Sequence, residues 1–439
     1  MTALPRLAGP ACMFLALSAL NWACTDLPSS PNLDEPTAEM SKLALPNPQR
    51  TALQDGIAHY TFDLPLGPGP FDVVRLHRVV KEQRPNHPVR TADAVFLLPG
   101  APNSWPVIFM EPVVSAAIPW DQSIAIFLAK NDIDVWGIDY AWAQVPLETT
   151  NFDFMEGWGV QKDVDFAYEA LAAAQAIRVA TGQGNGRFHV LGFSYGVPVG
   201  YALAGRETRL PPGQRIVKGL IPVDLELKYE DPWRRAAACA NGAAQQEVID
   251  SGTYEDGSFV PLIALAALAE TSPTEPSPIP GLNILEFILY ATATGNSHFV
   301  GAYFDDVGIP TGLRFTNTTL WLHMLQGTPP YWPLQAGAEV AYARCETGLD
   351  VSFDDHLQDI AVPIFNVGAA GGSGVGGNYT ASLTASKDLQ SFVVQVLPDD
   401  QWMYDFGHGD LFTATDAATQ VWQPILTWIM EHRENRVYP

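Results

Sequence analysis

The sequence is poor in basic residues. Its 439 residues include 24 lysines and arginines against 48 aspartates and glutamates, a formal net charge of −24 at pH 7. A surface of this sign repels the phosphates of nucleic acids and the headgroups of anionic lipids. The composition therefore argues against a nucleic-acid partner and against electrostatic docking on an anionic membrane.

Cysteine is also scarce. Of four cysteines, Cys12 and Cys24 fall in the first 24 residues, which leaves Cys239 and Cys345 for the folded domain. Two such cysteines can pair in an oxidising compartment, so a Cys239–Cys345 disulfide is one possibility and two free thiols are the other. No pair of histidines or cysteines has the spacing of metal ligands. We expect no metal site and no cofactor.

The N-terminus has the pattern of a targeting segment. Residues 1–24 carry Arg6 and the run "CMFLALSALNWA", which is too short to span a bilayer comfortably and is typical of a signal peptide. Ala23-Cys24 resembles the end of a lipoprotein signal, in which Cys24 would carry the lipid. Residues 25–54 are rich in Pro, Ser, Asp and Glu, a composition typical of a disordered tether. We therefore expect an extracytoplasmic protein that is secreted, periplasmic or lipid-anchored, with lipidation at Cys24 as its only route to a membrane.

The rest of the chain alternates apolar runs with helical patterns. Almost half of the residues are hydrophobic, which is enough for a large core. The pattern predicts strands at 57–65, 71–81, 92–100, 134–140, 187–193, 217–224, 360–368 and 391–398, with helices near 121–130, 161–181, 197–205, 380–389 and 415–432. Continuous apolar strands separated by helices indicate an α/β fold with a mostly parallel sheet covered on both faces. Residues 55–224 and 346–439 would form this core.

Residues 225–345 interrupt the alternation. They contain apolar helical segments and proline-rich loops with no clear strand, so we expect a helical cap inserted between two strands of the core. Within it, Trp321, Met324, Tyr331 and Trp332 either line an apolar substrate pocket or pack the core of the cap itself.

One serine lies where a buried strand meets a helix. The stretch "HVLGFSYGVPVG" places Ser194 between Gly192 and Gly196 in a G-x-S-x-G motif. A sharp turn at this place would lift the serine hydroxyl clear of the sheet, and the following helix would point backbone N–H groups at the reacting centre. The strand, motif and helix together are more specific than the five residues alone, and they predict a nucleophile at Ser194.

Three segments in this order resemble the α/β-hydrolase superfamily: "FLLPGAPNSW" (96–105), "GFSYG" (192–196) and "FGHGDLF" (406–412). The resemblance runs from about residue 57 to the end, apart from the divergent cap, which would lie between strands 6 and 7 of that fold. It implies a catalytic triad with Ser194 as nucleophile and His408 as base. It also implies an oxyanion hole formed by the backbone N–H groups of Tyr195 and Ala101, although Pro99-Gly100 stands where relatives often have His-Gly.

The acid of the triad does not stand in the usual place of the superfamily. Most of the superfamily places it after the seventh strand, but that loop reads "AAGGSGVGGNYT" and contains no carboxylate. Some members place it one strand earlier, where this chain has "GLIPVDLELKYED". We therefore predict Asp224, with Glu226 and Asp231 as alternatives. The glycine-rich loop itself is expected to be mobile and close to the cleft.

A serine nucleophile argues against haloalkane dehalogenases and epoxide hydrolases, which share this fold but use aspartate. The prediction is a secreted serine hydrolase of the lipase or carboxylesterase type that cleaves a lipophilic ester. A peptidase, amidase or lactonase on the same fold stays open, as does a non-catalytic binding protein. The run from Gly372 to Gly377 also matches G-x-G-x-x-G of dinucleotide folds, but it begins too far after the strand and too close to the C-terminus.

Overall fold

The computed structural model describes residues 47–183, 186–295, 298–345 and 347–433. The predicted signal peptide with Cys24, and the part of the predicted tether up to residue 46, lie outside the described residues. Within them, no helix has the length and apolar character needed to cross a membrane.

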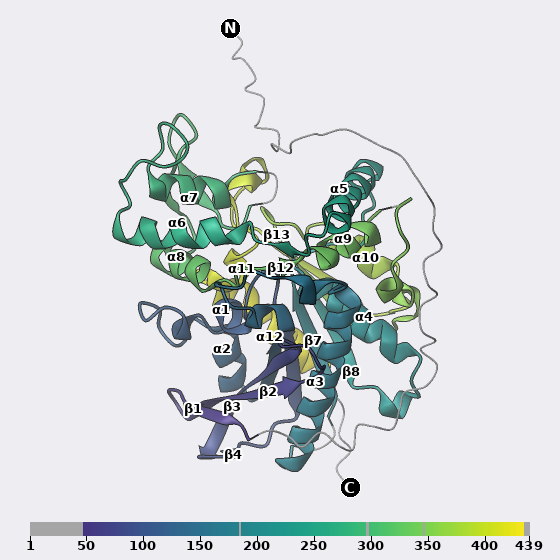
Figure 1. Cartoon of the computed structure of the whole chain (residues 1–439). Coiled ribbons are helices and arrows are strands. Elements are labelled where there is room, and N and C mark those ends of the chain that lie inside the picture. Colours follow the sequence, from purple (N-terminus) through teal and green to yellow (C-terminus); the bar gives the residue numbers. More distant parts are fainter. Residues whose placement is uncertain (1–46, 184–185, 296–297, 346, 434–439) are drawn as a thin grey trace. The chain divides into compact units, whose positions relative to one another are not determined.

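The core is a twisted, mostly parallel sheet (Figure 1). Its strands run in the order β1-β2-β3-β6-β5-β7-β8-β13-β14, with β4 paired to β3. β1, β2 and β3 pair antiparallel with one another, and β3 with β6, whereas every pair from β6 to β14 is parallel. The bounds are β1 Gln49–Ala52, β2 Ile57–Pro65, β3 Val73–Arg84, β4 His87–Pro88, β5 Asp93–Leu98, β6 Ile133–Asp139, β7 Phe188–Phe193, β8 Val217–Val223, β13 Ile364–Ala369 and β14 Leu389–Val394.

The predicted order of strands and helices is confirmed, with shifted ends. Every residue of β5, β6, β7 and β8 is buried, as expected for strands covered on both faces. The tether was predicted to reach residue 54, but residues 49–52 form β1, because they pair antiparallel with the edge of β2. The ion pair between Arg50 and Glu82 of β3 holds β1 in place.

Helices cover the two faces of the sheet and build two apolar clusters. α3 Val160–Ala180 and α4 Gly196–Thr208 pack on one face, and α1 Trp105–Phe109, α2 Ile124–Lys130 and α12 Gln423–Glu431 pack on the other. The short helices α10 Gly377–Ser382 and α11 Asp410–Thr413 follow β13 and β14. α3 is rich in alanine, which favours helix and allows close packing on the sheet. The predicted last helix, 415–432, is shorter, with a π-helical turn at 418–422 before α12.

Between β8 and β13 the described residues form five α-helices: α5 Pro232–Asp250, α6 Phe259–Thr271, α7 Ile284–Ala293, α8 Thr318–Gly327 and α9 Leu334–Ala343. They fall into two groups, α6–α8 and α5 with α9 (Figure 1). The first group adds side chains to one apolar cluster, while α9 adds side chains to the other.

The prediction that residues 225–345 contain no strand was wrong. Two small antiparallel ribbons occur there, β10 Ala302–Phe304 with β11 Pro310–Leu313, and β9 Glu255–Asp256 with β12 Trp332–Pro333. These strands have two to four residues, too few for an alternating apolar pattern to be visible in the sequence.

A disulfide joins Cys239 of α5 to Cys345, which follows α9, with the two Cα atoms 4.7 Å apart. The same two helices pack side by side. The bond therefore ties the first and last helices of residues 225–345 to each other.

Candidate active site

Ser194 lies in the tight turn between β7 and α4. Its backbone φ is 52°, in the left-handed region that non-glycine residues rarely adopt, at a cost of about 1–3 kcal/mol. Its N–H donates to the carbonyl of Val223 at 2.9 Å, which fixes the turn to the end of β8. A Cβ atom at Gly192 would collide with the backbone of Gly196, and one at Gly196 with the carbonyl of Leu98. Both glycines of the motif are therefore required by close backbone approach.

Asp224 directly follows β8 and is completely buried. Like Ser194, it has a positive φ of 52°. Its carboxylate accepts three backbone N–H groups, from Ala369 at 2.8 Å, Ser373 at 2.9 Å and Gly374 at 2.8 Å. Burial alone would raise the pKa of Asp224, but the hydrogen bond and charge of His408, together with the backbone donors, outweigh it and lower that pKa. Asp224 is therefore held as a carboxylate.

The three backbone donors belong to the end of β13 and to the glycine-rich loop that follows it. The mobility expected for this loop stays a prediction, and in the structure two of its amides donate to Asp224. A Cβ atom at Gly372 would overlap the carboxylate oxygen, and one at Gly374 would overlap the Asp224 backbone. The loop that carries no acid thus wraps around the acid of the neighbouring strand, which explains both its glycines and its lack of a carboxylate.

His408 lies in the loop before α11, with its imidazole directed at Asp224. Its Nδ1 is 2.7 Å from Oδ2 of Asp224. Because a carboxylate can only accept, Nδ1 carries the hydrogen, and Nε2 of the neutral ring is left as an acceptor. The ring also packs against Phe193, the residue before Ser194, with centroids 4.5 Å apart. His408 thus connects the acid at the end of β8 to the turn at the end of β7.

The loop of His408 is fixed by a segment from residues 225–345. The N–H of His408 donates to the carbonyl of His298 at 2.9 Å, and the N–H of Gly409 donates to the carbonyl of Phe299. The buried carboxyl of Asp410 accepts the N–H groups of both Gly301 and Gly407. Burial raises the pKa of Asp410 to about 7. The position of the imidazole therefore depends on residues 298–301 as well as on its own loop.

The loop after β5 passes directly against Ser194. A Cβ atom at Gly100 would lie 2.6 Å from Cβ and 3.2 Å from Oγ of the serine, so only glycine fits. Ala101 follows it, and the N–H of Asn103 donates back to the carbonyl of Gly100 at 2.7 Å. The predicted oxyanion residue Ala101 thus follows the residue that lies against the serine, in a turn closed by its own backbone.

Tyr195 stands at the N-terminus of α4, and its ring is buried behind the turn. Its hydroxyl donates to Oδ2 of Asp163 at 2.7 Å, and Trp142 Nε1 donates to the same oxygen at 3.2 Å. Burial, against these two hydrogen bonds, raises the pKa of Asp163 to about 7. Asp163 was not found from the sequence, because a single acidic residue in the first turn of a predicted helix is usually solvated or a cap.

The alternative acids are bound elsewhere. Glu226 accepts a hydrogen bond from Arg234 Nη1 at 2.7 Å. Asp231 is the N-cap of α5 and accepts the N–H groups of Trp233 and Arg234. Neither carboxylate is hydrogen-bonded to His408 in the described structure.

The candidate pocket residues fall in two places. Trp321 and Met324 are buried in α8 and belong to the same apolar cluster as Phe193 and Phe412. Trp332 is half-buried and packs edge-on against Tyr195, with centroids 5.4 Å apart, beside the other cluster. The three therefore belong with two different apolar clusters, and their role as a substrate pocket stays a prediction.

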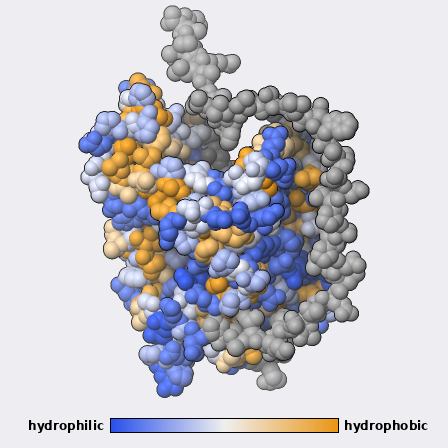
Figure 2. Space-filling model, in the orientation of Figure 1, coloured by the Kyte–Doolittle hydropathy of each residue, from blue (hydrophilic) through white to orange (hydrophobic). Residues whose placement is uncertain are grey.

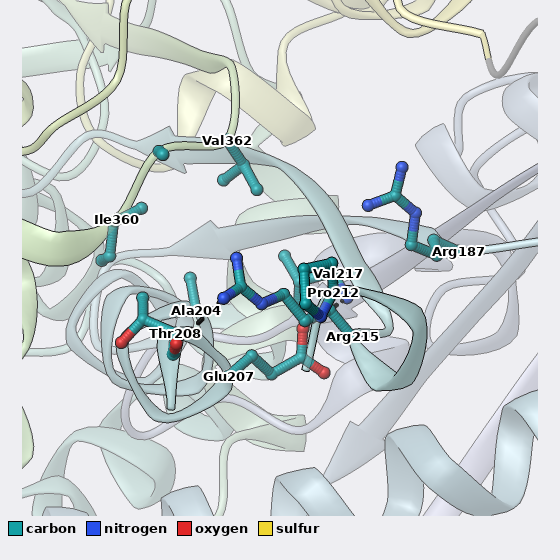
Figure 3. Close-up of a pocket in the computed structure, with 10 residues that line it drawn as sticks. Arg187, Ala204, Glu207, Thr208, Pro212, Arg215, Val217, Ile360 and Val362 are labelled. Atoms are coloured by element: carbon teal, nitrogen blue, oxygen red, sulfur yellow. Dashed lines mark hydrogen bonds between the residues drawn. The ribbon is translucent and has the colours of Figure 1, made fainter. Parts of the chain in front are cut away.

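A separate hollow of about 150 Å³ lies at the far end of α4 and β8 from Ser194 and Asp224 (Figure 3). Its carboxylate, Glu207, accepts the N–H groups of Ile216 and Val217. Arg215 donates to the carbonyls of Thr208 and Leu210. These polar groups hold the turn between α4 and β8, and we assign the hollow no role in the chemistry.

Among the described residues, no group of three or more His, Cys, Asp or Glu side chains is arranged to hold a metal ion. What the site offers instead is a serine on a strained turn, an imidazole with a free acceptor nitrogen, and a buried carboxylate bound to that imidazole.

No protein-family model and no curated protein matches the sequence. Among solved structures, the chain is similar to a candidate lipase from Sulfolobus solfataricus, with a TM-score of 0.63 at 20% identity over 88% of this chain and 99% of that one. A thermophilic esterase from Thermogutta terrifontis is more distant, with a TM-score of 0.43 at 13% identity over 85% of this chain and 99% of that one. A candidate lipase from Acinetobacter baumannii AYE has a TM-score of 0.44 at 12% identity over 86% of this chain and 93% of that one. The first likeness, together with the strand order, establishes that this chain has the α/β-hydrolase fold.

Proposed function

We propose that the protein is a serine hydrolase that cleaves carboxylic esters through Ser194, His408 and Asp224. The observation that carries the proposal is the 2.7 Å hydrogen bond from His408 Nδ1 to the buried Asp224 carboxylate, beside a serine on a strained strand-to-helix turn. A hydroxyl alone is a poor nucleophile and needs a base whose orientation and tautomer are fixed.

In the proposed reaction, Ser194 Oγ attacks the ester carbonyl carbon while His408 Nε2 takes the hydroxyl proton. The resulting oxyanion is stabilised by the N–H groups of Tyr195 and Ala101. The bond from that carbon to the alcohol oxygen then breaks, and His408 returns the proton to the leaving alcohol. Water, deprotonated by His408, then attacks the carbonyl carbon of the acyl-enzyme. The bond from that carbon to Ser194 Oγ breaks, Oγ takes the proton back from His408, and the carboxylic acid is released. Asp224 stabilises the imidazolium formed in both halves of the reaction.

A lipophilic ester is favoured by the surface around the α6–α8 group. α6 is apolar almost throughout, yet only Ala266 and Ala269 are fully buried. Leu268, Ile279 and Phe299 are exposed large apolar side chains in or near this group. Figure 2 shows hydrophobic side chains gathered on its surface. Contiguous exposed apolar surface of this kind is typical of sites that bind apolar ligands or interfaces.

The test is hydrolysis of p-nitrophenyl esters of increasing acyl length by the wild type, Ser194→Ala and the matched control Ser251→Ala. Ser251 is exposed on the end of α5 and only donates to the carbonyl of Val248. We expect Ser194→Ala to lose activity and Ser251→Ala to retain it, with a fluorophosphonate adduct located on Ser194 by mass spectrometry. Equal rates for all three proteins would refute the proposal, and a preference for the shortest acyl chains would refute a lipase.

We also propose that the mature protein is exported. The disulfide between Cys239 and Cys345 supports this, because structural disulfides persist in oxidising compartments. Intact-mass spectrometry of the protein recovered from an expressing bacterium tests it. Loss of the first 23 or 24 residues supports export, and added acyl mass on Cys24 supports lipidation. A full-length cytosolic protein with free thiols would contradict the proposal.

A further inference from the structure

Three polar side chains form a row across the antiparallel side of the sheet, with His77 and Asp139 buried and His59 half-buried. His59 of β2, His77 of β3 and Asp139, the last residue of β6, lie on neighbouring strands. His59 Nε2 is 3.0 Å from His77 Nδ1, and His77 Nε2 is 3.1 Å from Asp139 Oδ2. Trp105 stacks on the imidazole of His77, with centroids 4.7 Å apart and an interplanar angle of 8°. None of these residues belongs to the triad proposed above.

The hydrogen bond to Asp139 has one direction. Because the carboxylate only accepts, His77 Nε2 carries the hydrogen, and a neutral His77 accepts at Nδ1 from His59 Nε2–H. Burial, followed by the repulsion of a protonated His77, lowers the pKa of His59 to about 3, so His59 is neutral at neutral pH. Burial raises the pKa of Asp139, but His77, the backbone donor Trp105 and the charge of Arg75 outweigh it and lower that pKa.

The second oxygen of Asp139 leads to the candidate active site. Oδ1 accepts the backbone N–H of Trp105, the first residue of α1, at 2.6 Å. Residues 99–104 form the loop between β5 and α1, so this bond fixes the helix residue that follows the far end of the loop. The near end contains Gly100, which lies against Ser194, and Ala101, the predicted oxyanion donor. The loop is thus held at β5 on one side and at Asp139 on the other.

We propose that Asp139, oriented by His77 and His59, is a positioning residue for the oxyanion loop. The inference rests on the proposed function, because it assigns the loop a role in stabilising the oxyanion. Asp139 does not touch the substrate. It acts through the Trp105 N–H by holding residues 99–105 at the distance from Ser194 that the transition state requires. A donor displaced by about 1 Å can lower a rate on the order of a hundredfold while leaving ground-state binding largely intact.

The test compares Asp139→Ala, Asp139→Asn and the control Asp63→Asn in hydrolysis of p-nitrophenyl butyrate. Asp63 is an exposed carboxylate on β2 that pairs with Arg75, so its replacement removes a nearby charge without touching the loop. We expect Asp139→Ala to lower kcat about 10- to 100-fold with KM within about threefold. Asp139→Asn, whose amide oxygen can still accept the Trp105 N–H, should recover most of the rate, and Asp63→Asn should match the wild type.

Inhibition by a trifluoromethyl ketone, which forms an oxyanion on the nucleophile, provides the second readout. Its Ki should weaken in Asp139→Ala by the same factor as kcat/KM. If Asp139→Ala does not fold, His77→Phe, which keeps a ring stacked on Trp105, should lower kcat about 3- to 10-fold with KM unchanged.

The inference is overturned if Asp139→Ala keeps the kcat of the wild type, or if its KM rises while kcat is unchanged. If His77→Phe is used in place of Asp139→Ala, the same two results in that variant overturn it. Ser194→Ala is measured alongside. If it is inactive while Asp139→Ala is unimpaired, only this inference fails. If Ser194→Ala keeps the wild-type rate, the proposed function itself fails.

Discussion

Two aspartates on opposite sides of the nucleophile turn are both buried, yet their pKa values move in opposite directions. Asp224 accepts three backbone N–H groups and the imidazole N–H of His408, and its pKa is lowered. Asp163 accepts a tyrosine hydroxyl and an indole N–H, and its pKa is raised to about 7. Burial penalises both charges, so the number and kind of donors decide which group stays ionised. The difference assigns the charge-stabilising role to Asp224 and a role in holding Tyr195 to Asp163.

The comparison is tested most severely by Asp224→Asn. Both oxygens of Asp224 accept backbone N–H groups, so the NH2 group of an asparagine would face a donor with its own hydrogens. The amide also carries no negative charge to hold the Nδ1–H tautomer of His408. We expect kcat to fall about 10⁴-fold on p-nitrophenyl butyrate, with the fold checked by thermal denaturation. The matched control is Glu226→Gln, which breaks only the pair with Arg234 and should keep most of the activity. A larger loss in the control would move the acid to Glu226.

Gly372→Ala tests whether the glycine-rich loop after β13 positions the carboxylate of Asp224. The added Cβ would overlap Oδ2 of Asp224 and displace the carboxylate from His408. We expect kcat to fall about 10- to 100-fold, because small displacements of positioned groups cost rates of this order. Gly213→Ala serves as the control, since a Cβ there meets no atom within 4 Å. Equal kinetic effects of the two substitutions would show that the glycine loop does not position the acid.

The raised pKa of Asp163 predicts how the free energy of unfolding depends on pH. The folded pKa lies above the unfolded value of about 3.9, so wild-type stability falls as the pH rises from about 4 to 7 and stays reduced above it. Asp163→Asn removes this loss and keeps an oxygen that can accept from Tyr195. We expect the stability advantage of the variant over the wild type to grow by about 2–3 kcal/mol between pH 5 and pH 8, measured by urea unfolding.

A stability difference that is the same at both pH values would refute this assignment. Asp410, whose pKa is also raised to about 7, contributes in the same direction in both proteins and cancels in the comparison. The contribution of Asp224 to stability changes with pH in the opposite direction. Because its pKa is lowered in the folded protein, Asp224 stabilises the fold at pH values above the pKa of the unfolded state, and this contribution is lost as the pH falls.

The smallest effect is expected for Tyr195→Phe. It removes the hydroxyl that donates to Asp163 but leaves the backbone N–H at the start of α4. We expect a loss of about 1–2 kcal/mol in unfolding free energy and a kcat within about tenfold of the wild type. Tyr168→Phe, on the half-exposed face of α3, is the control. A collapse of kcat in Tyr195→Phe would show that the ring has a part in the chemistry.

The sequence predicted the fold well because the signals are local. Buried parallel strands are continuous apolar runs, and β5, β7 and β8 are all of this kind. The short ribbons at 302–313 and at 255–256 with 332–333 were missed, because strands of two to four residues show no alternating pattern. The second ribbon also depends on a partner distant in sequence.

The candidate site was predictable where a motif marks it and unpredictable where partners come from afar. Ser194 and His408 stand in glycine-flanked motifs, and Asp224 follows a strand. The donors to Asp224 lie 145 to 150 residues further along the chain. Nothing local in "AAGGSGVGGNYT" reveals that its amides bind a carboxylate. Asp163 and Asp139 were missed for the same reason, since their importance comes from what packs against them.

The disulfide has a consequence for how the chain can be cut. Cys239 and Cys345 are 106 positions apart, so they close most of the segment between β8 and β13 into a covalent ring. A protease that cleaves one bond inside this ring leaves the protein as a single molecule without reduction. The nicked chain would migrate as one band on a non-reducing gel and as two on a reducing gel. The exposed proline-rich turn at 273–280 could be opened in this way while Ser194, Asp224 and His408 remain on one linked chain.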